Sequence, residues 1–193
     1  MRVIAGKKRG QKLVEFSAEN IRPTPDRVKE ALFSMIEPHL SDAVVLDLFS
    51  GTAALAIESL SRGAKEAVCV DASKQSLDVI KKNLSLTEFN TSAKVFLSEA
   101  VEFLNKQSPS QFDVIFLDPP YSKNIEDNVL KKIDSMDLLK PDGIIILETE
   151  YAHVPDDFKN LHISKQRKYG RTYITIYIKN DIEISLNERC VDK

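Results

Sequence analysis

An aspartate, two prolines and a tyrosine, Asp118 to Tyr121, stand directly after the strongly apolar run 114–117. Consecutive prolines lack backbone N–H groups and have a fixed φ, so this segment is predicted to form a rigid turn with carbonyl oxygens available as acceptors. A carboxylate, a carbonyl and an aromatic ring together suit a planar amino group conjugated to a nucleobase. The acceptors would hold its hydrogens, and the ring would hold the base in line with an electrophile. We therefore predict a catalytic turn made of Asp118, Pro119, Pro120 and Tyr121.

Acidic residues stand at or beside the ends of all the predicted parallel strands: Asp47, Asp71, Glu99, Asp118 and Glu148. In open α/β sheets the ligand lies beyond the carboxyl ends of the strands, where the strand order reverses. A row of carboxylates disfavours a dinucleotide, and the turn after the first strand lacks the full glycine pattern of dinucleotide sites. S-adenosylmethionine suits this edge better, because it carries a sulfonium, an ammonium, ribose hydroxyls and an adenine amino group but no phosphate. We predict it as the cofactor.

Placing these residues at one edge requires alternating strands and helices, and the hydrophobic pattern predicts them. Runs that are almost wholly apolar and rich in Val and Ile are typical of parallel strands covered on both faces. The predicted strands are 43–48, 67–70, 93–97, 112–117 and 143–147, and the predicted helices are 54–62, 74–86, 100–107 and 125–136. Two extended segments, 162–168 and 172–179, predict an antiparallel hairpin added to the sheet edge. The fold class is therefore α/β, a doubly wound and mostly parallel sheet.

The first forty residues are predicted to form a basic extension and a helix that packs on the core. Residues 1–16 alternate basic and apolar positions around Gly6 and Gly10, which indicates a small hairpin or a mobile arm. Thr24 followed by Pro25 is a sound helix start, and apolar residues continue at helical spacing to Ile36. The expected division is an arm and helix at 1–40, a Rossmann-like domain at 41–180 and a polar tail at 181–193.

Charge is distributed unevenly along the chain. Residues 1–40 hold 8 Lys+Arg against 5 Asp+Glu, residues 158–180 hold 6 against none, and residues 41–157 hold 11 against 20, giving +3, +6 and −9. Two basic segments around an acidic centre indicate a polyanion held at the edges and a different ligand in the middle. The candidate RNA contacts are Lys7, Lys8, Arg9, Lys168 and Arg171.

Composition excludes several classes of protein. A chain of 193 residues, 42% apolar and 29% charged, fits one globular domain with a sizeable core. The sequence has no signal-peptide pattern and no run long enough to span a membrane, so we expect a cytoplasmic protein without membrane contact. The three histidines and two cysteines show no ligand or disulfide spacing, so no metal site is predicted.

Several segments, in order along the chain, resemble the RsmD family of bacterial small-subunit ribosomal RNA guanine-N2 methyltransferases. They are the opening 2–6, the segment 22–33, the Asp-Leu-Phe-x-Gly stretch from Asp47, the acid Asp71 and the turn 118–121. The resemblance runs from Met1 to about Lys179. It implies the class I S-adenosylmethionine-dependent methyltransferase fold, with 16S ribosomal RNA in the assembled or assembling 30S subunit as the substrate, and we expect a monomer.

The matched residues imply a division of labour. Asp118 and the Pro119 carbonyl would orient the N2 hydrogens of a flipped-out guanine while Tyr121 stacks on the base, aligning it for direct displacement. Asp71 would bind the cofactor ribose and Glu99 its adenine side. Arg22 and Thr24 would close over the cofactor from the N-terminal segment. The full cofactor set is Arg22, Thr24, Asp47, Phe49, Gly51, Asp71 and Glu99.

One departure from the family pattern lies in the first turn. The family usually has Gly-x-Gly where this chain has Gly51-Thr52-Ala53, and Ala56 also replaces a frequent glycine. We expect the Ala53 methyl to crowd the methionine end of the cofactor or to require a shifted backbone. Two rival functions stay open. One is an adenine-N6 DNA methyltransferase, which usually needs a base-reading segment that this chain has no room for. The other is a non-catalytic RNA-binding or assembly factor that keeps the fold.

Overall fold

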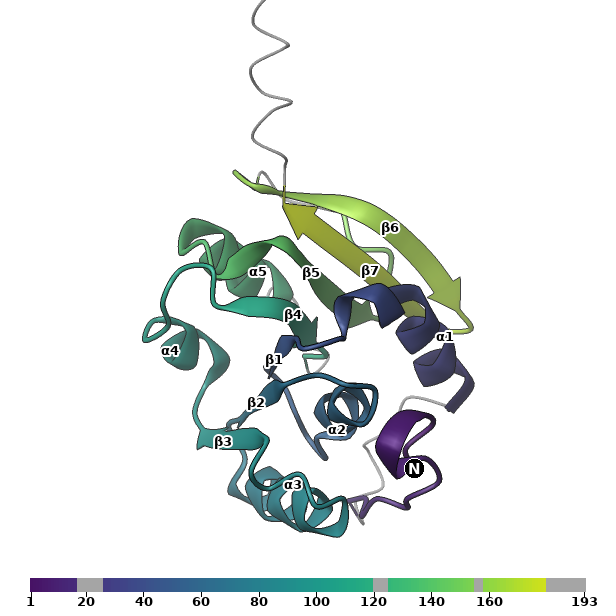
Figure 1. The fold of residues 1–193 in the computed structure, drawn as a ribbon. Helices are drawn as coiled ribbons and strands as arrows, with labels where there is room; N and C mark the ends of the chain where they lie inside the picture. The colour runs from purple at the N-terminus through teal and green to yellow at the C-terminus, as the bar shows by residue number, and fades with distance from the viewer. Residues whose placement is uncertain (17–25, 120–124, 155–157, 180–193) are drawn as a thin grey trace, which may run out of the picture.

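In the computed structural model, a seven-stranded sheet runs through the centre of the chain and helices cover both of its faces (Figure 1). The structure describes residues 1–16, 26–119, 125–154 and 158–179. The strand order is β3-β2-β1-β4-β5-β7-β6, so the order reverses between β1 and β4. The strands are β1 Val44–Asp47, β2 Glu66–Asp71, β3 Ala93–Leu97, β4 Phe112–Leu117, β5 Leu139–Thr149, β6 Leu161–Tyr169 and β7 Thr172–Lys179.

Strands β1 to β5 are parallel, and β7 pairs antiparallel with both β5 and β6. The predicted doubly wound sheet ending in an antiparallel hairpin is confirmed. Two short 3-10 turns, Gly6–Lys8 and Glu37–His39, accompany the helices. The helices are α1 Asp26–Ile36, α2 Ala54–Ser61, α3 Lys74–Leu86, α4 Ala100–Leu104 and α5 Ile125–Ser135.

The alternation of side chains along the strands divides the core into two layers. Even-numbered residues of β1 and β2, such as Leu46 and Val68, pack with α4 and α5 on one face. On the other face, α1 covers Val45 and its neighbours in β4, β5 and β7, while α2 and α3 cover β2. Because apolar residues point to both faces of the inner strands, those strands have no solvated side.

The N-terminal segment forms the predicted small hairpin, closed by an antiparallel bridge between Arg2 and Lys12. It is docked on the core, because Val3 and Leu13 are buried in the cluster that α2 and α3 form over β2. Gly6 has φ +78°, and a Cβ there would lie 1.9 Å from the Ser61 carbonyl oxygen. Only glycine therefore permits this approach of the hairpin to the end of α2.

A buried carboxylate anchors the hairpin. Glu58 of α2 is fully buried and accepts the backbone N–H groups of Ile4 at 2.7 Å and Ala5 at 2.9 Å. The same carboxylate pairs with buried Lys29 of α1 at 3.3 Å and with Arg62 at 2.9 Å. Glu58 thus joins the hairpin, α1 and α2 at one point.

Three predicted features lie wholly or partly outside the described residues. They are the start of the first helix at Thr24 and Pro25, the residues Arg22, Pro120 and Tyr121, and the tail 181–193. Among the residues that the structure describes, no helix has the length and apolar character needed to cross a membrane.

Candidate cofactor and acceptor site

The reversal of strand order between β1 and β4 brings three aspartates to one edge of the sheet. Asp47 ends β1, Asp71 ends β2, and Asp118 directly follows β4. In the sheet, β1 lies between β2 and β4, so Asp47 is the central member of the group. Three carboxylates at a topological switch point form an acceptor-rich site for a cationic or donor-rich ligand.

Asp47 is the most deeply buried of the three, with 2% of its surface exposed. Burial, together with the nearby charges of Asp118 and Asp71, raises the pKa of its carboxyl to about 7, and a hydrogen bond from the Ala56 N–H opposes this rise. That hydrogen bond is 3.3 Å long and comes from the first turn of α2. A positive ligand charge beside Asp47 would therefore meet a carboxyl poised to ionise near neutral pH.

Asp71 organises the turn after β1. Its carboxylate accepts the N–H of Gly51 at 2.9 Å and the N–H of Ser73 at 2.8 Å. Ser50 completes the connection, since its hydroxyl donates to the Asp47 carbonyl at 2.6 Å and accepts the N–H of Val70 at 3.1 Å. The turn is thereby fixed between the ends of β1 and β2 before any ligand binds.

Asn83 of α3 also fixes this turn, through a hydrogen bond to the Thr52 carbonyl. Its side-chain amide donates to the carbonyls of Thr52 and Val14, both at 3.0 Å, and its oxygen accepts the Val14 N–H at 2.7 Å. The backbone of the N-terminal segment therefore passes beside the turn. An added Cβ on Gly51, which has φ +52°, would lie 3.9 Å from the ring of Phe16 and meet nothing nearer. The backbone at Gly51 is consequently open to close approach by a ligand.

Ala53 adopts the left-handed conformation, with φ +61° and ψ +27°. Its methyl is fully buried in the cluster of the hairpin, α2 and α3. The methyl therefore lies in the core, and the alanine holds a left-handed conformation that glycine would adopt without strain. A left-handed alanine costs about 1–2 kcal/mol relative to the right-handed form.

We expect Ala53→Gly to leave the free energy of unfolding within about 1 kcal/mol of the parent. The relief of strain, about 1–2 kcal/mol, is offset by the lost methyl burial and by the larger entropy of the unfolded glycine. The affinity for S-adenosylmethionine should stay within about twofold. Denaturant unfolding and calorimetry measure these quantities. The control is Ala56→Gly inside α2, which should lower the free energy of unfolding by about 1 kcal/mol or more. Much tighter cofactor binding by Ala53→Gly would show that the methyl crowds the ligand.

Asp118 stands at the exposed edge of the site, and Pro119 after it is buried. The residue as a whole is exposed, but the protein around its carboxyl group partly desolvates that group. This desolvation raises the pKa of Asp118 to about 6. Asp118 is thus mostly ionised at neutral pH yet close to its titration range. Pro120 and Tyr121, the other predicted members of the turn, lie outside the described residues.

The remaining predicted cofactor residues have different surroundings. Phe49 is partly buried against the cluster beneath α4 and α5, and Glu99 is exposed immediately before α4. Glu99 follows β3, two strands from β1 in the sheet, which leaves it at the outer side of the site. Arg22 and Thr24 are outside the described part of the chain. Their predicted contacts with the cofactor stay predictions.

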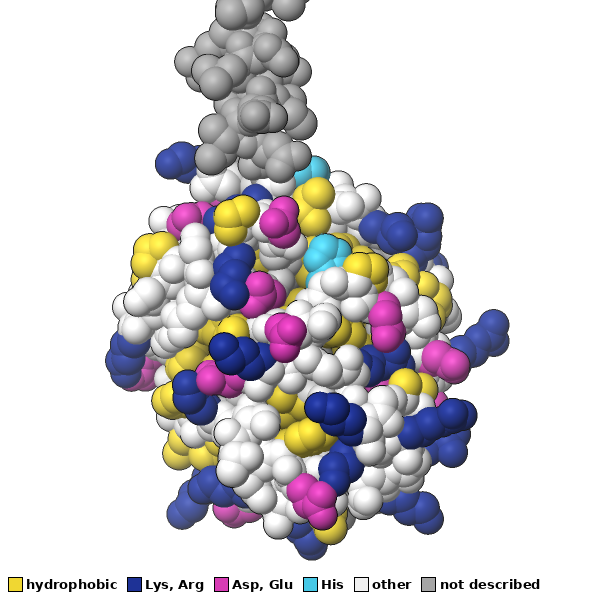
Figure 2. Space-filling model, viewed as in Figure 1, with side chains coloured by type: hydrophobic (Ala, Val, Ile, Leu, Met, Phe, Trp, Pro, Cys, Tyr) yellow, Lys and Arg dark blue, Asp and Glu magenta, His cyan; other side chains and the backbone are white. Residues whose placement is uncertain are grey.

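The predicted RNA contacts lie in two regions. Lys7 and Arg9 are exposed on the docked hairpin, while Lys8 pairs with Glu88. Lys168 and Arg171 are exposed at the turn between β6 and β7. On the face that Figure 2 shows, Lys and Arg side chains project around the rim of the molecule. Within the described ranges, no group of His, Cys, Asp and Glu side chains is arranged to hold a metal ion.

Comparisons with known proteins agree with this geometry. A model of the family described as conserved hypothetical protein 95 matches residues 1–178. The chain is 38% identical over 179 residues to ribosomal RNA small subunit methyltransferase D of Haemophilus influenzae, covering 92% of this chain and 93% of that protein. It is 30% identical over 178 residues to the protein of the same name from Escherichia coli strain K12, covering 92% and 89%. The chain belongs to the RsmD family.

Solved structures support the same assignment. The fold superposes on yhhF, a candidate methyltransferase from Escherichia coli, with a TM-score of 0.80 and 28% identity over 93% of this chain and 98% of that one. A candidate methylase from Haemophilus influenzae, HI0767, gives a TM-score of 0.77 and 33% identity over the same shares. As a member of this family, the protein has an S-adenosylmethionine-dependent methyltransferase fold.

The described site fits that cofactor. The open backbone at Gly51 admits close approach, and Asp47, Asp71 and Glu99 offer acceptors for the ammonium, hydroxyl and amino hydrogens that the molecule presents. Sequence reasoning missed two residues that hold this arrangement, Ser50 and Asn83. An asparagine inside a predicted helix was the available sign for Asn83, because its amide needs partners when buried.

We expect cofactor binding to strengthen as the pH rises through about 7 and to level off above it. A cationic ligand favours ionised Asp47, whose pKa is about 7 in the ligand-free protein. Calorimetry in buffers of different ionisation enthalpy should detect proton release near neutral pH. Asp47→Asn should bind more weakly and lose this pH dependence.

The same substitution should affect stability in the opposite direction. The pKa of Asp47 is higher in the folded protein than the ordinary value of 3.8, so the folded state binds more protons between about pH 4 and 7. Rising pH through that window therefore lowers the free energy of unfolding, and Asp47→Asn should be more stable than the parent at pH 8. Parallel stability profiles for both proteins would contradict the assignment.

Proposed function

We propose that this protein transfers the methyl group of S-adenosylmethionine to the exocyclic N2 of a guanine in 16S ribosomal RNA, in the assembled or assembling 30S subunit. The observation that carries the proposal is the position of Asp118, which stands beside Asp47 at the strand-order reversal in a chain of this family. The relatives named ribosomal RNA small subunit methyltransferase D support the choice of substrate. Such a substrate places the activity in the cytoplasm.

Asp118 has the properties needed to hold an amino group. An ionised carboxylate accepts hydrogen bonds from the amine, and the carbonyl of Pro119 is the proposed second acceptor. The pKa of about 6 means that the carboxylate can also take the proton that leaves the nitrogen. A methylated amine of this kind is strongly acidic before deprotonation, so a weak base is sufficient. We propose that Tyr121 stacks on the base.

When bound, S-adenosylmethionine supplies an electrophilic methyl group on a positively charged sulfur. The protein's part is to bind and orient: Asp71 and Ser50 fix the turn at Gly51, and Asp47 places a carboxyl at the centre of the site. We propose that Asp71 also accepts from the ribose hydroxyls and that Glu99 faces the adenine. Alignment of this type supplies a large part of the rate enhancement in group transfer.

The basic surfaces are proposed to hold the RNA backbone. Lys7 and Arg9 are presented by a hairpin that the core fixes in place, and their exposed charges are suited to phosphate contacts. Lys8 would have to exchange its pair with Glu88 for a phosphate. Lys168 and Arg171 present a second group of charges at the β6–β7 turn.

A methyl-transfer assay tests the proposal directly. Purified protein and labelled cofactor are incubated with 30S particles that lack the modification, with protein-free 16S RNA and with duplex DNA, followed by nucleoside analysis. We expect N2-methylguanosine from the particle. N6-methyladenine from DNA would establish the rival DNA enzyme. Particle binding without cofactor binding or methyl transfer would establish the non-catalytic assembly factor.

A further inference from the structure

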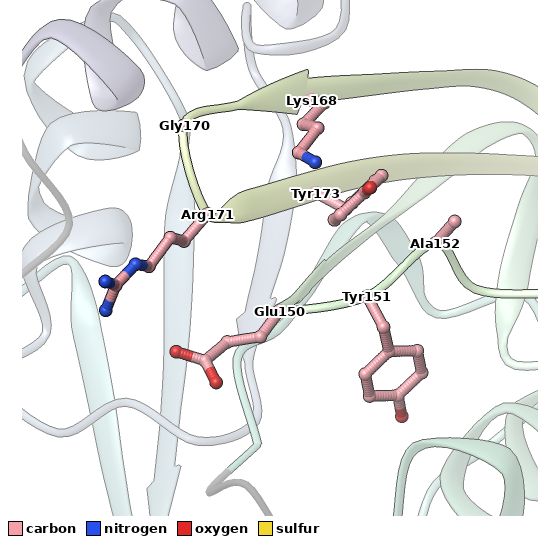
Figure 3. Close-up of a pocket in the computed structure, with 7 residues that line it drawn as sticks. All are labelled: Glu150, Tyr151, Ala152, Lys168, Gly170, Arg171 and Tyr173. Carbon is pink, nitrogen blue, oxygen red and sulfur yellow. The ribbon is translucent and has the colours of Figure 1, made fainter.

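A pocket of about 400 Å³ lies between the loop that follows β5 and the turn between β6 and β7 (Figure 3). Glu150, Tyr151 and Ala152 line it from the loop, and Lys168, Arg171 and Tyr173 line it from the hairpin. The volume is within the range of sites that bind small molecules. Sequence reasoning identified the two cations as RNA contacts but predicted no pocket around them.

The pocket opens on the same edge of the sheet as the catalytic turn. Leu117 of β4 pairs with Leu147 of β5, so Asp118 and the loop at Glu150 both follow the carboxyl ends of neighbouring strands. Thr149 in turn pairs with Tyr173 at the start of β7. Strands are about 4.8 Å apart, which places β7 about 10 Å from β4 across the sheet. A nucleotide next to a base held at Asp118 can reach that distance.

The chemistry of the lining suits a nucleotide. The Lys168 ammonium lies 5.1 Å from the centre of the Tyr173 ring, which holds this cation at the pocket. Figure 3 shows Arg171 and Glu150 extending to one side of the pocket and Tyr151 to the other. Among the ion pairs of the described residues, none includes Arg171 or Glu150. Tyr151 is 47% exposed. The pocket thus combines cations with aromatic rings, because Lys168 lies over the Tyr173 ring and the exposed Tyr151 also lines it. These are the groups that bind phosphate and stack a base in single-stranded nucleic acid.

The wall of the pocket is held in place by hydrogen bonds. The Tyr151 hydroxyl donates to Glu126 at the start of α5, and the Tyr151 carbonyl accepts from Thr149 at 2.6 Å. Further along the loop, Gln166 donates to the His153 carbonyl at 2.9 Å, and the His153 ring lies between Asp127 and Tyr177. The loop is thus tied both to the hairpin and to α5, the helix that follows the catalytic turn.

The geometry points to a second nucleotide site in this pocket, which holds a single-stranded RNA nucleotide flanking the target base. Lys168 and Arg171 bind its phosphates, the Tyr151 ring stacks on its base, and Glu150 accepts a hydrogen from the base edge. This inference rests on the proposed function, since it requires an RNA substrate with an unpaired neighbour beside the modified base. A site of this kind would select substrates by the accessibility of two nucleotides instead of one.

Fluorescence provides a direct test because the chain has no tryptophan. Tyr151→Trp places a reporter in the pocket, and Phe96→Trp on β3, at the far end of the sheet, is the control. Each protein is titrated with a short single-stranded RNA of mixed sequence, with nucleoside monophosphates, with nucleosides and with inorganic phosphate. We expect RNA and nucleotides to quench the reporter at 151 but not the control. Inorganic phosphate should compete without quenching.

Charge variants show whether RNA binding depends on the pocket or on the general basic charge of the surface. In the Tyr151→Trp protein, Lys168→Ala with Arg171→Ala should weaken RNA binding at least tenfold. It should also lower the slope of log affinity against log salt by about 0.7 for each lost phosphate contact. The matched control is Lys165→Ala with Arg167→Ala, which removes the same charge from the other face of β6, since Lys168 and Arg167 are adjacent on that strand. The control should keep the parent affinity and slope.

The outcomes separate the inference from the proposed function. Equal losses in both charge variants, or no quenching by RNA in a protein that methylates 30S particles, would overturn the pocket assignment while the function stands. Quenching that depends on Lys168 and Arg171 in a protein that transfers no methyl group to 16S RNA would support the pocket and refute the function. Tyr151→Phe keeps the ring and should retain RNA binding, whereas Tyr151→Ala should lose it at least tenfold.

Discussion

Asp118→Ala should lower the turnover number for methyl transfer by about 10²–10⁴-fold, the range for loss of a positioned acid–base group. In the proposed mechanism this side chain contacts the acceptor base and not the cofactor, so the affinity for S-adenosylmethionine should stay within a few-fold. Removing its charge also lowers the pKa of Asp47, because Asp118 is one of the charges that raise it. The pH at which cofactor binding levels off should consequently move down. Single-turnover kinetics and calorimetry across pH measure both effects.

Asp71→Ala is the matched control, because it removes a carboxylate from the other side of Asp47. It loses the bonds to the Gly51 and Ser73 N–H groups and the proposed bonds to the ribose, each worth about 1.5–3 kcal/mol for a charged group. Cofactor affinity should therefore fall before the chemical step does. Near-normal turnover of Asp118→Ala at saturating cofactor would refute the assigned role of the turn.

Glu58→Gln should lower the free energy of unfolding by about 3–5 kcal/mol, as expected when one partner of a buried charge cluster is removed. The neutral amide leaves Lys29, which is 2% exposed, without its counter-charge in the interior. In the parent protein the Glu58 carboxylate accepts hydrogen bonds from the backbone N–H groups of Ile4 and Ala5. In the variant, the NH₂ group of the glutamine amide would face one of these donors. Equilibrium denaturation monitored by circular dichroism gives the change.

Glu37→Gln separates burial from charge in this experiment. Glu37 pairs with the same Arg62 at 2.7 Å, but its side chain is 59% exposed. Exposed pairs contribute at most about 1 kcal/mol, so this variant should unfold close to the parent midpoint. If the two variants lose the same stability, Glu58 is not the anchor of the N-terminal hairpin.

The sheet and the acidic edge could be predicted because their signals are local and repeated. Continuous Val- and Ile-rich runs identify buried parallel strands, and parallel strands must bring Asp47, Asp71 and Asp118 to one edge. The hairpin of β6 and β7 could also be predicted from short-range features, because extended sequence patterns stand on each side of Gly170. The residues within and next to each of these elements are therefore sufficient to predict it.

The start of β5 could not be predicted in this way. Pro141, Asp142 and Gly143 normally interrupt a strand, yet β5 begins before them, at Leu139. The register between β4 and β5 shifts at this point, between Phe112 and Val114. Asp113 at the shift accepts the Val44 N–H at 2.8 Å and the Lys140 ammonium at 2.7 Å. The irregularity is stabilised by partners that no local pattern specifies.

The buried position of Glu58 and the left-handed conformation of Ala53 could not be predicted for a related reason. A glutamate in a helix usually indicates an exposed position, but the partners of Glu58 lie in other elements. Likewise, nothing near Ala53 in sequence predicts a positive φ for a residue with a side chain. Glu58 bonds to the N-terminal hairpin, and Ala53 packs in the same cluster as Val3 and Leu13 of that hairpin, whose docking the sequence left open.

The attachment of that hairpin has a consequence for the order of folding. Val14 bonds to a residue 69 positions later, and Ile4 to one 54 positions later, so the segment made earliest during synthesis finds its partners only after α2 and α3 exist. Contacts so distant along the chain are slow to form because a long loop must close first. In pulse-labelling hydrogen exchange, the Ile4 and Val14 amides should become protected after those of the inner strands. The turn at Gly51, where we propose that the cofactor binds, would then reach its final geometry as one of the last events of folding.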